Sequence, residues 1–455
     1  MDDAGRKGWL ERLLGLFTEV RAGEGGTALL LTLNVFLLLS AYYVIKPVRE
    51  ALILAGGGAE VKSYASVGQV LLLWLAVPLY ARLASRMSRR RLINAVTSFF
   101  IACLVAFYLL AQIEVPLGIV FFLWVGIFNL MVIAQFWAFA NDLYTNEQGK
   151  RLFAIVAFGA SAGAVFGSWV TGRLIGTLGV YQMMLVAAAV LTVATTITNL
   201  VDTRERRRLR AVTAGGPGGG DDDAGATIGR RGAFELVLRH RYLLLIAFLM
   251  LFLNWVNTTG EYILGRVVER AAHAAVEQGR AGGLGVGEFI GRFYSDFFAV
   301  VNVLALGIQL FFVSRIVKYL GVRVAVLILP CIALGGYLLL AVYPVLGAVR
   351  WVKTAENATD YSLQNTVRNI LFLPTTREEK YKAKQAIDTF FWRAGDVLSA
   401  ALVFAGTTWL AFETRDFALF NLTLVGVWLV LAFLVGRRYA RMASRLDGDN
   451  AREAA

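Results

Sequence analysis

The feature that most constrains this chain is a series of apolar runs, each about 20 residues long, which is the length that a helix needs to cross a bilayer. The first of them contains "TALLLTLNVFLLL". We count twelve such runs, at residues 27–46, 64–84, 92–112, 115–141, 152–176, 178–201, 242–264, 290–314, 321–343, 345–373, 386–412 and 416–437. The predicted fold class is therefore all-α: a polytopic membrane protein with twelve transmembrane helices.

Composition supports this class, since 58% of the 455 residues are hydrophobic, whereas soluble domains hold about 45–50% apolar residues. A formal net charge of +13 could indicate nucleic-acid binding, but the Lys and Arg residues gather in alternate loops. Examples are "ARLASRMSRRR", "NEQGKR", "SRIVKYLGVR" and "GRRYARMASR". This positive-inside pattern predicts cytoplasmic N- and C-termini and argues against a nucleic-acid partner.

The polar tract "DTRERRRLRAVTAGGPGGGDDDAGATIGRRG" cannot bury a core and divides the apolar runs into two sets of six. The basic segments "ARLASRMSRRRLI" and "SRIVKYLGVRVAVLI" follow the second run of each set, as expected for the parallel repeats of a major-facilitator-like protein. "GWLERLLGLFTEV" has the apolar spacing of a surface helix. We therefore predict a cytoplasmic amphipathic segment, a first six-helix bundle, a cytoplasmic linker, a second six-helix bundle and a cytoplasmic tail, at residues 1–26, 27–201, 202–238, 239–437 and 438–455.

The chain offers little material for catalysis or metal binding. Its cysteines, Cys103 and Cys331, and its histidines, His240 and His273, are the only residues of their kinds. No nucleophile–base pair and no paired-carboxylate motif is recognisable. We therefore expect no enzyme activity, no metal, no cofactor and no disulfide framework.

Three patterns indicate packing rather than function. Two pairs of opposite charge at helical spacing, Arg292 with Asp296 and Arg393 with Asp396, are typical of structural ion pairs. The segment "GASAGAVFGS" repeats small residues every fourth position, which favours close helix packing, at Gly159, Gly163 and Gly167.

The tenth run, "VRWVKTAENATDYSLQNTVRNILFLP", is the most polar. Its polar side chains fall three or four positions apart, as on one face of a helix, at Arg350, Lys353, Asn357, Asp360, Gln364 and Arg368. Ionisable residues inside spans usually face water or substrate, so we expect this face to line a cavity. The alternative is a set of mutually neutralising pairs, such as Lys353 with Glu356.

The first run ends in "SAYYVIKPVREALILAGG", where Lys46, Arg49 and Glu50 share one helix face around Pro47. These charges could simply end the helix at the lipid headgroups. However, "EALILAGG" continues the apolar pattern beyond them, so we expect the helix to continue and the charges to face a cavity. A further candidate, Glu261 in "NWVNTTGEYILG", could contact substrate or pair with a cation of the first helix.

Several segments together resemble the ATP/ADP translocases of plastids and intracellular bacteria. They are "YYVIKPVREALIL", "GAEVKSYASVGQVLLLWLAVPLYARLASRMSRRRL", "FWAFANDLYTNEQGKRLFAIVAFGASAGAVFGS" and "DYSLQNTVRNILFLPTTREEKYKAKQAIDTFFWRAGDVLSA". The resemblance covers nearly the whole chain except the linker and the termini. It implies a twelve-helix, major-facilitator-like fold that exchanges adenine nucleotides across a membrane, here the bacterial inner membrane.

The resemblance also implies roles for particular residues. Lys46 and Arg49 match a cationic pair of the family, Glu50 matches the acid beside that pair, and Glu261 matches a glutamate of the seventh helix. Arg368 takes the place of the lysine in a Lys-Glu pair, whose glutamate is replaced by Asn369 here. The chain departs from the family at Ser66 and Val125, where the family carries a lysine and a glutamate.

We therefore predict a nucleotide transporter that works by alternating access, with a cationic central cavity. The cations would be Lys46, Arg49, Arg350, Lys353 and Arg368, and the aromatic wall for adenine would come from Tyr42, Tyr43, Trp137 and Tyr361. The expected partners are a nucleotide or another anionic small molecule and the lipid bilayer. Two alternatives stay open: a transporter of another anionic metabolite, with or without proton coupling, and a membrane interaction or sensor protein that does not transport.

Overall fold

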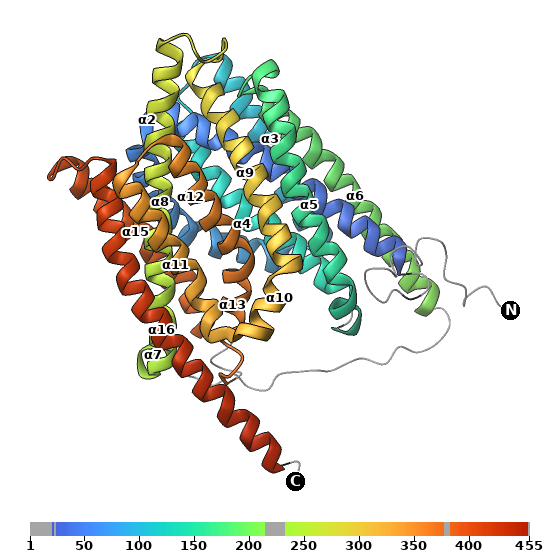
Figure 1. The fold of residues 1–455 in the computed structure, drawn as a ribbon. Helices are drawn as coiled ribbons and strands as arrows, with labels where there is room; N and C mark the ends of the chain where they lie inside the picture. The colour runs from blue at the N-terminus through green and yellow to red at the C-terminus, as the bar shows by residue number, and fades with distance from the viewer. Residues whose placement is uncertain (1–20, 22–23, 145, 214–232, 377–382, 454–455) are drawn as a thin grey trace. The chain divides into compact units, whose positions relative to one another are not determined.

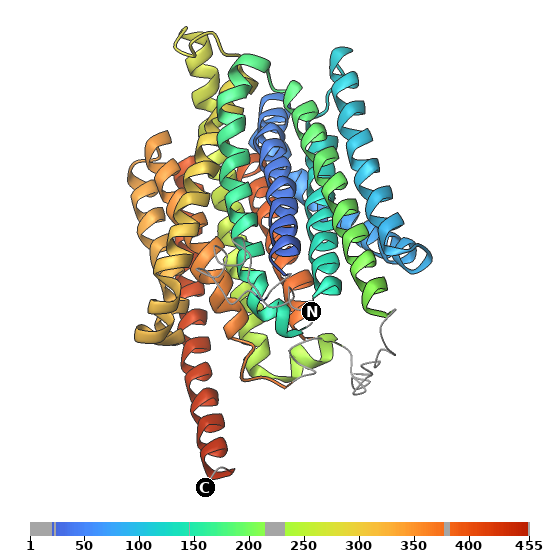
Figure 2. The same cartoon turned by 90° about the vertical axis from the view of Figure 1, so that its right-hand side faces the viewer.

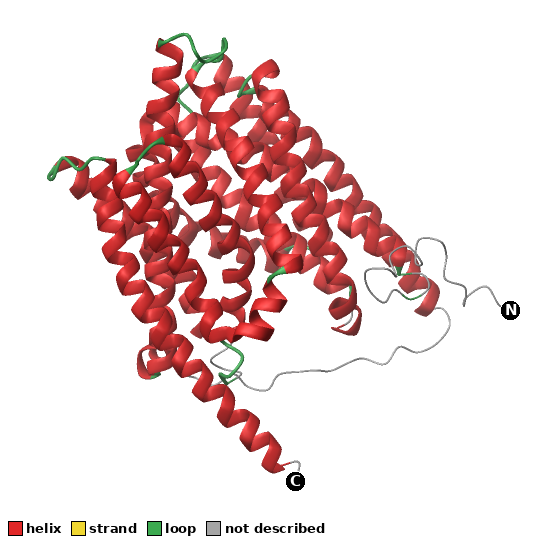
Figure 3. Cartoon of the chain, in the orientation of Figure 1, coloured by secondary structure: helices red, strands yellow, loops and turns green. Residues whose placement is uncertain are grey.

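The computed structural model describes residue 21 and residues 24–144, 146–213, 233–376 and 383–453. Within these residues every regular element is a helix and no strand occurs (Figure 3). The all-α prediction is therefore confirmed for the part of the chain that the structure describes. The amphipathic segment predicted at residues 8–20 lies outside the described residues.

The chain divides into two compact units. Unit 1 comprises residues 1–56, 71–222 and 281–299, and unit 2 comprises residues 57–70, 223–280 and 300–455. Each unit thus includes a short segment from the other half of the sequence. Residues 57–70 overlap the start of the predicted span 64–84, and residues 281–299 overlap the start of the predicted span 290–314. These are the second spans of the two halves, so the two segments occupy corresponding places, as expected for an internal repeat.

Most of unit 1 is built from long apolar helices, which Figures 1 and 2 show in blue to green, apart from the last of them, which is yellow. In the chain order of the sequence they are α2 Gly25–Arg86 without its residues 57–70, α3 Arg89–Gln112, α4 Gly118–Leu143, α5 Asn146–Leu178, α6 Gln182–Thr213 and the first part of α9 Val286–Phe311. Helix α6 packs against α3 and α5.

Helix α2 continues through the charged segment of the first span, as the sequence predicts. It runs past Lys46 and Glu50 and is interrupted only at Gly58, whose φ of 79° is a conformation that glycine adopts without strain. The helix resumes at Ala59, whose backbone N–H donates to Glu269 Oε2 at 2.9 Å. An acid at this position satisfies one of the amides that a new helix start leaves unpaired.

The glycine repeat of α5 lies against α2. A methyl group at Gly159, Gly163 or Gly167 would overlap the backbone of Thr32, Phe36 or Ser40, respectively. The hydroxyl of Ser40 also donates to the carbonyl oxygen of Gly163 at 3.2 Å. The prediction of close helix packing is confirmed, and a larger side chain at these positions would push α5 away from α2.

Unit 2 is centred on α8 Arg241–Glu277, which packs against several other helices of the unit. These neighbours are α7 Ala233–Arg239, α12 Leu346–Thr359, α15 Trp392–Thr408 and α16 Thr414–Glu453. The remaining elements are α10 Val313–Arg315, η1 Ile316–Leu320, α11 Gly321–Val342, η2 Asp360–Gln364, α13 Asn365–Ile370, α14 Lys384–Ala386 and η4 Ile387–Phe391. Helix α16 packs along α8 and α11, and its C-terminal end projects beyond them (Figures 1 and 2).

Nine helices in the described residues are long and apolar enough to cross a membrane. The first of these, Gly25–Tyr80, covers two predicted spans because the break at Gly58 divides it. The tenth and eleventh predicted spans do not count among the nine, since π-helical turns at η2 and η4 divide each of them into short pieces. The chain is a multi-pass membrane protein, and the number of twelve spans stays a prediction.

Candidate functional site

Unit 2 holds a cavity of about 300 Å³, at the lower end of the range for small-molecule pockets. Its lining comes from α8, the η2–α13 segment and α15: Leu253, Asp360, Tyr361, Gln364, Asn365, Arg368 and Trp392. Three members of the polar series predicted for the tenth span are among these residues.

The π-helical turn η2 explains why only part of that series reaches the cavity. A π turn holds one more residue than an α turn, so it rotates everything that follows relative to what precedes it. Before the turn, Lys353 and Asn357 are buried among α8 and α11 side chains. From the turn onward, Asp360, Gln364 and Arg368 line the cavity. The sequence spacing predicts one continuous face, whereas the structure divides it into a buried half and a cavity half.

Arg368 is the cation of this cavity. Its guanidinium carbon lies 5.1 Å from the centre of the Trp392 ring, a distance at which a cation–π interaction stabilises the charge. Its Nη2 donates to Asn365 Oδ1 at 3.3 Å. The buried Nε has no partner among the described residues. Arg368 therefore keeps donor capacity for an anion in the cavity.

Gln364 is the most deeply buried polar residue of the cavity wall. Its side chain is only 2% exposed, and neither amide atom has a hydrogen-bond partner in the described part of the chain. Leaving both a donor and an acceptor unpaired costs about 1–3 kcal/mol for each group. A polar ligand, or water in its absence, would relieve that cost, which makes Gln364 a candidate recognition group.

Lys353 lies in a different environment on the preceding helix. The side chain is fully buried, and its Nζ lies 2.8 Å from Glu356 Oε2, 3.0 Å from Asn257 Oδ1 and 3.6 Å from Glu261 Oε1. A buried ammonium is tolerated only with such partners. The neutralising pair Lys353–Glu356, the alternative drawn from the sequence, is present.

The network around Lys353 extends to two neighbouring side chains. Asn357 Nδ2 donates to Glu261 Oε1 at 3.0 Å, and Tyr337 OH lies 3.4 Å from Glu356 Oε2. Gly260 lies directly against Tyr337 and Lys353, so a side chain there would displace them. Glu261 therefore pairs with Lys353 of the tenth predicted span. Arg350, at the start of the same helix, is half-buried.

The cations of the first span lie among aromatic rings in unit 1. Lys46 is 7% exposed, and its Nζ lies 3.8 Å from the centre of the Phe298 ring and 5.0 Å from that of Tyr43. Arg49 forms an ion pair with the buried Glu50, and its guanidinium carbon lies 4.9 Å from the centre of the Phe122 ring. Such rings stabilise a cation that has lost part of its water.

The predicted aromatic wall is divided in the structure. Tyr42 and Tyr43 surround Lys46, and Tyr361 lines the unit 2 cavity. Trp137 instead packs edge-on against Phe153, at 5.9 Å between ring centres, and contributes to the contact of α4 with α5.

Sequence reasoning missed Trp392 and Lys62. Trp392 stands in the quoted segment "TFFWRAGD", but nothing in the sequence connects it with Arg368 across the intervening loop. Lys62, which is 8% exposed, lies one helical turn before Ser66, and its carbonyl oxygen accepts from the Ser66 hydroxyl at 3.1 Å. The sequence could have identified Lys62 as a candidate, since it shares a helix face with Ser66, the position where the family has a lysine. Val125 is fully buried.

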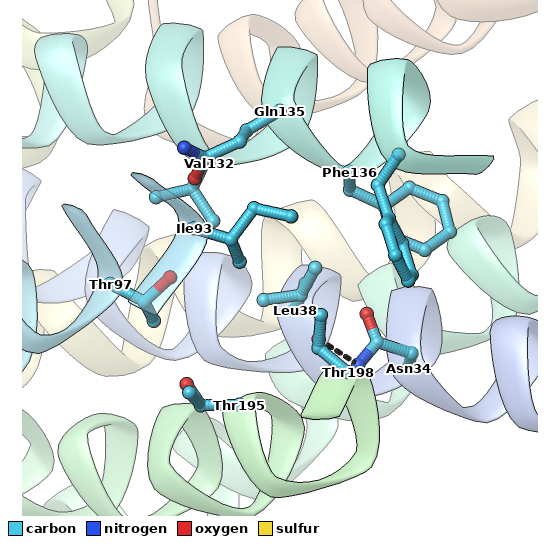
Figure 4. Close-up of a pocket in the computed structure, with 10 residues that line it drawn as sticks. Asn34, Leu38, Ile93, Thr97, Val132, Gln135, Phe136, Thr195 and Thr198 are labelled. Atoms are coloured by element: carbon cyan, nitrogen blue, oxygen red, sulfur yellow. Dashed lines mark hydrogen bonds between the residues drawn. The ribbon is translucent and has the colours of Figure 1, made fainter. Parts of the chain in front are cut away.

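A second, much smaller pocket lies in unit 1, among α2, α3, α4 and α6 (Figure 4). Its volume of about 20 Å³ holds one water molecule at most. Asn34 Nδ2 points to Thr198 Oγ1 at 2.7 Å and also donates to the carbonyl oxygen of Ala194. This pocket therefore serves helix packing and cannot hold a metabolite.

The two ion pairs predicted as structural differ in outcome. Arg393 pairs with Asp396 at 3.2 Å, and Asp396 also accepts from Asn254 at 2.8 Å, which joins α15 to α8. Arg292 and Asp296 are both exposed, and no ion pair joins them in the described structure. No group of three or more His, Cys, Asp or Glu residues that could hold a metal ion occurs in the described residues.

Comparison with known proteins gives a family-model match over part of the chain and a similar fold. The family model described as TLC ATP/ADP transporter matches residues 10–123. No curated protein matches the chain.

Similar solved structures are transporters. The nucleoside transporter NupG is 13% identical, with 91% of this chain and 98% of that chain covered and a TM-score of 0.61. A POT family transporter in complex with 5-aminolevulinic acid is also 13% identical, with 96% and 98% covered and a TM-score of 0.61. A bacterial homolog of the human lysosomal transporter Spinster is 14% identical, with 92% and 98% covered and a TM-score of 0.57. At such low identity these likenesses concern the fold alone.

The matching family model describes transporters, and the solved structures that share the fold are transporters. The resemblance to the ATP/ADP translocases is therefore confirmed by a family model over residues 10–123, in a chain that has the fold of major-facilitator-like transporters.

Proposed function

We propose that this protein transports nucleotides across the bacterial inner membrane by ATP/ADP-type exchange, and that the unit 2 cavity binds part of the nucleotide. The observation that carries the proposal is Arg368, which lies over Trp392 in a cavity of about 300 Å³. Beside it lies the amide of Gln364, which has no hydrogen-bond partner in the described residues. The family match supports the choice of nucleotide.

The chemistry of the cavity suits this substrate. A guanidinium presents a planar set of N–H donors that matches phosphate oxygens in pairs, and Arg368 retains unused donors. A glutamine amide offers one donor face and one acceptor atom, which is the combination that the edge of a nucleobase presents. Trp392 and Tyr361 add aromatic surface against which a base can lie.

We assign different roles to the predicted site residues. Asp360 and Arg368 would contact the substrate in unit 2, and Lys46 and Arg49, the latter held by Glu50, would do so in unit 1. Lys353 would act indirectly, since its partners Glu261 and Glu356 neutralise it and it holds Glu261 in place. Arg350 would contribute to the positive electrostatic potential of the site. Lys62 would supply the charge that the family carries at the position of Ser66.

That Lys46 and Arg368 act on the same substrate stays a prediction. A double-mutant cycle tests it: if both cations hold one polyanion, the loss from Lys46→Ala combined with Arg368→Ala will differ from the sum of the single losses. Additive losses would contradict a shared substrate.

The decisive experiment is uptake of radiolabelled ATP and ADP by proteoliposomes preloaded with unlabelled nucleotide. We expect exchange by the wild type, a large loss in Arg368→Ala, and no loss in Arg315→Ala, which removes an exposed arginine far from the cavity in sequence. Absence of uptake of every nucleotide by folded wild-type protein would reject the proposal.

A second candidate function is transport of another anionic metabolite. It is favoured by Ser66 and the fully buried Val125, since the family has charged residues at both positions. A thermal-shift screen in detergent separates the two, because a specific ligand raises the melting temperature of the folded state. A higher melting temperature with an anion that is not a nucleotide, and no change with ATP or ADP, would favour this second function.

A further inference from the structure

A second sizeable cavity in unit 2, of about 470 Å³, combines a cluster of cations with an apolar wall. It lies along α8 and α16 and is lined by Arg241, Leu244, Leu245, Phe248, Leu434, Arg437, Arg438 and Arg441. None of these residues belongs to the candidate substrate site.

The packing of α8 against α16 brings the arginines together. The two helices are antiparallel: the Tyr262 ring lies 4.9 Å from that of Phe417, and Asn421 Nδ2 donates to the carbonyl oxygen of Val256 at 3.0 Å. From that hydrogen bond, Arg241 lies 15 residues back along α8 and Arg437 lies 16 residues on along α16. At 1.5 Å per residue both are about 22–24 Å from it, at the same level of the bundle.

Within the described residues these four arginines have no counter-charge. No carboxylate lines the cavity, and no hydrogen bond or ion pair from the four side chains is seen in the described residues. Glu235 of the adjoining helix α7 is already paired with Arg239, at 3.0 Å. Four cations around one cavity repel one another, so a bound anion would lower the free energy of this end of the bundle.

The apolar wall continues from the arginines toward the middle of both helices. Phe248 is 41% exposed and Leu434 is 39% exposed, and both helices are among those apolar enough to span a membrane. The cavity thus offers a strongly basic end and an adjoining apolar strip. A ligand that fits both parts carries an anionic group and a hydrocarbon chain.

We propose that this cavity is a binding site for an anionic phospholipid, with the phosphate held by the four arginines and an acyl chain along Leu244, Phe248 and Leu434. The charges of the loops predict that this end of both helices is cytoplasmic, where a basic pocket between transmembrane helices can take an anionic headgroup. A soluble nucleotide fits less well, because the wall offers no uncharged hydrogen-bonding side chain and leaves an apolar strip exposed. The bound lipid would tie α8 to α16.

The test compares wild type with Arg437→Gln/Arg438→Gln in nanodiscs and in detergent, using phosphatidylglycerol, cardiolipin, phosphatidylcholine and inorganic phosphate as separate probes. Native mass spectrometry counts retained lipid, and thermal unfolding reports stabilisation. We expect phosphatidylglycerol or cardiolipin to be retained and to raise the melting temperature, with roughly 25-fold weaker binding in the double variant.

The matched control is Arg82→Gln/Arg86→Gln, which removes the same charge from the basic C-terminal end of α2 in unit 1. We expect it to retain anionic lipid as the wild type does. If Arg437→Gln/Arg438→Gln does not fold, two other variants replace it in the comparison. We expect Arg241→Gln to lose anionic lipid and the charge-conserving Arg437→Lys/Arg438→Lys to retain it.

Three results would overturn the proposal: equal retention of phosphatidylcholine, an equal loss in the control variant, or stabilisation by inorganic phosphate as large as that by the lipids. The last would indicate a site for a soluble anion. Because lipid retention does not depend on transport, these outcomes are independent of the proposed exchange of nucleotides.

Discussion

Lys353 and Arg368 lie 15 residues apart on one predicted span, yet the structure gives them opposite environments. Lys353 is fully buried with Glu356 and Glu261 within 4 Å, whereas Arg368 lies at a cavity, over the ring of Trp392. The π-helical turn η2 separates them. A cation whose charge is already balanced by fixed acids attracts an anionic substrate only weakly, whereas a cation at a cavity can bind such a substrate. The polarity of a span therefore does not by itself identify which of its charges bind substrate.

The largest effect that we expect from this difference is on stability, at Lys353. Replacement by Met removes the ammonium and leaves Glu356 buried without its main partner, which costs about 3–5 kcal/mol. We expect Lys353→Met to yield little folded protein, measured by size-exclusion chromatography and thermal unfolding in detergent. The double variant Lys353→Met/Glu356→Gln should recover much of the loss. If Lys353→Met is as stable as wild type but fails to transport, Lys353 is a substrate ligand and the comparison fails.

The next effect is on transport, at Arg368. Charge-assisted hydrogen bonds contribute about 1.5–3 kcal/mol each, so Arg368→Gln should lower the affinity for ADP by about 10- to 100-fold. Its melting temperature should change little, because no acid of the described residues lies within hydrogen-bonding distance of Arg368. Competition by unlabelled ADP in proteoliposomes measures the affinity. Arg368→Lys should recover part of it, since the charge stays while the guanidinium over the Trp392 ring is lost.

A smaller effect is expected at Gln364, and it sharpens the assignment of the cavity. Gln364→Leu removes an amide that has no partner in the described residues, so the protein should be as stable as wild type or slightly more stable. If the Gln364 amide forms hydrogen bonds with the nucleobase, the variant should lose about 5- to 10-fold in affinity for ADP. It should also discriminate less between nucleobases. The control Asn369→Leu changes an exposed amide on the neighbouring turn and should leave both properties unchanged. Unaltered base preference in Gln364→Leu would remove Gln364 from the site.

The smallest effect concerns an ion pair near the ends of two helices, between Glu24, which precedes α2, and Arg151 of α5, at 3.1 Å. Burial by itself would raise the pKa of Glu24, but hydrogen bonds from Arg151, the backbone N–H of Arg21 and Gln148 outweigh it and lower the pKa below its usual 4.5. A carboxyl group with a lowered pKa stabilises the fold above its unfolded-state pKa and loses that contribution as the pH falls through its folded-state pKa. Glu24→Gln should therefore be less stable than wild type at pH 7.

This difference between wild type and Glu24→Gln should shrink below about pH 4.5. Thermal unfolding of both proteins between pH 7 and pH 3.5 measures it. A constant difference across this range would mean that the charge of Glu24 contributes nothing. The pair serves as the reference for Lys353–Glu356, whose loss should cost several times more because it is wholly buried.

Parts of the site could be predicted because they depend on local patterns. The continuation of α2 past Lys46 follows from "EALILAGG", and the packing of α5 on α2 follows from glycines repeated every four residues. The pair Lys353–Glu356 follows from i, i+3 spacing. In each case the relevant contact is set by helix geometry over a few residues, which the sequence displays directly.

Other parts could not be predicted, because they depend on residues that are distant in the sequence. Trp392 meets Arg368 across more than twenty residues, and Asn257 and Glu261 meet Lys353 across nearly a hundred. The turn η2 changes which face of the bundle the later side chains of the tenth span point to. Its sequence, "DYSLQ", contains no Gly or Pro that would predict such a turn. The four arginines beside α8 and α16 likewise come from opposite ends of the second half of the chain.

The sequence by itself determined that this chain crosses a membrane as helices, since hydrocarbon leaves backbone groups no other way to be paired, and it showed the family resemblance. Tertiary structure alone decided which charges are neutralised and which remain available, because a buried charge is governed by its partners and those partners come from other helices. The same polar series in the tenth span thus yields a buried ion-pair network on one side of η2 and a candidate binding cavity on the other.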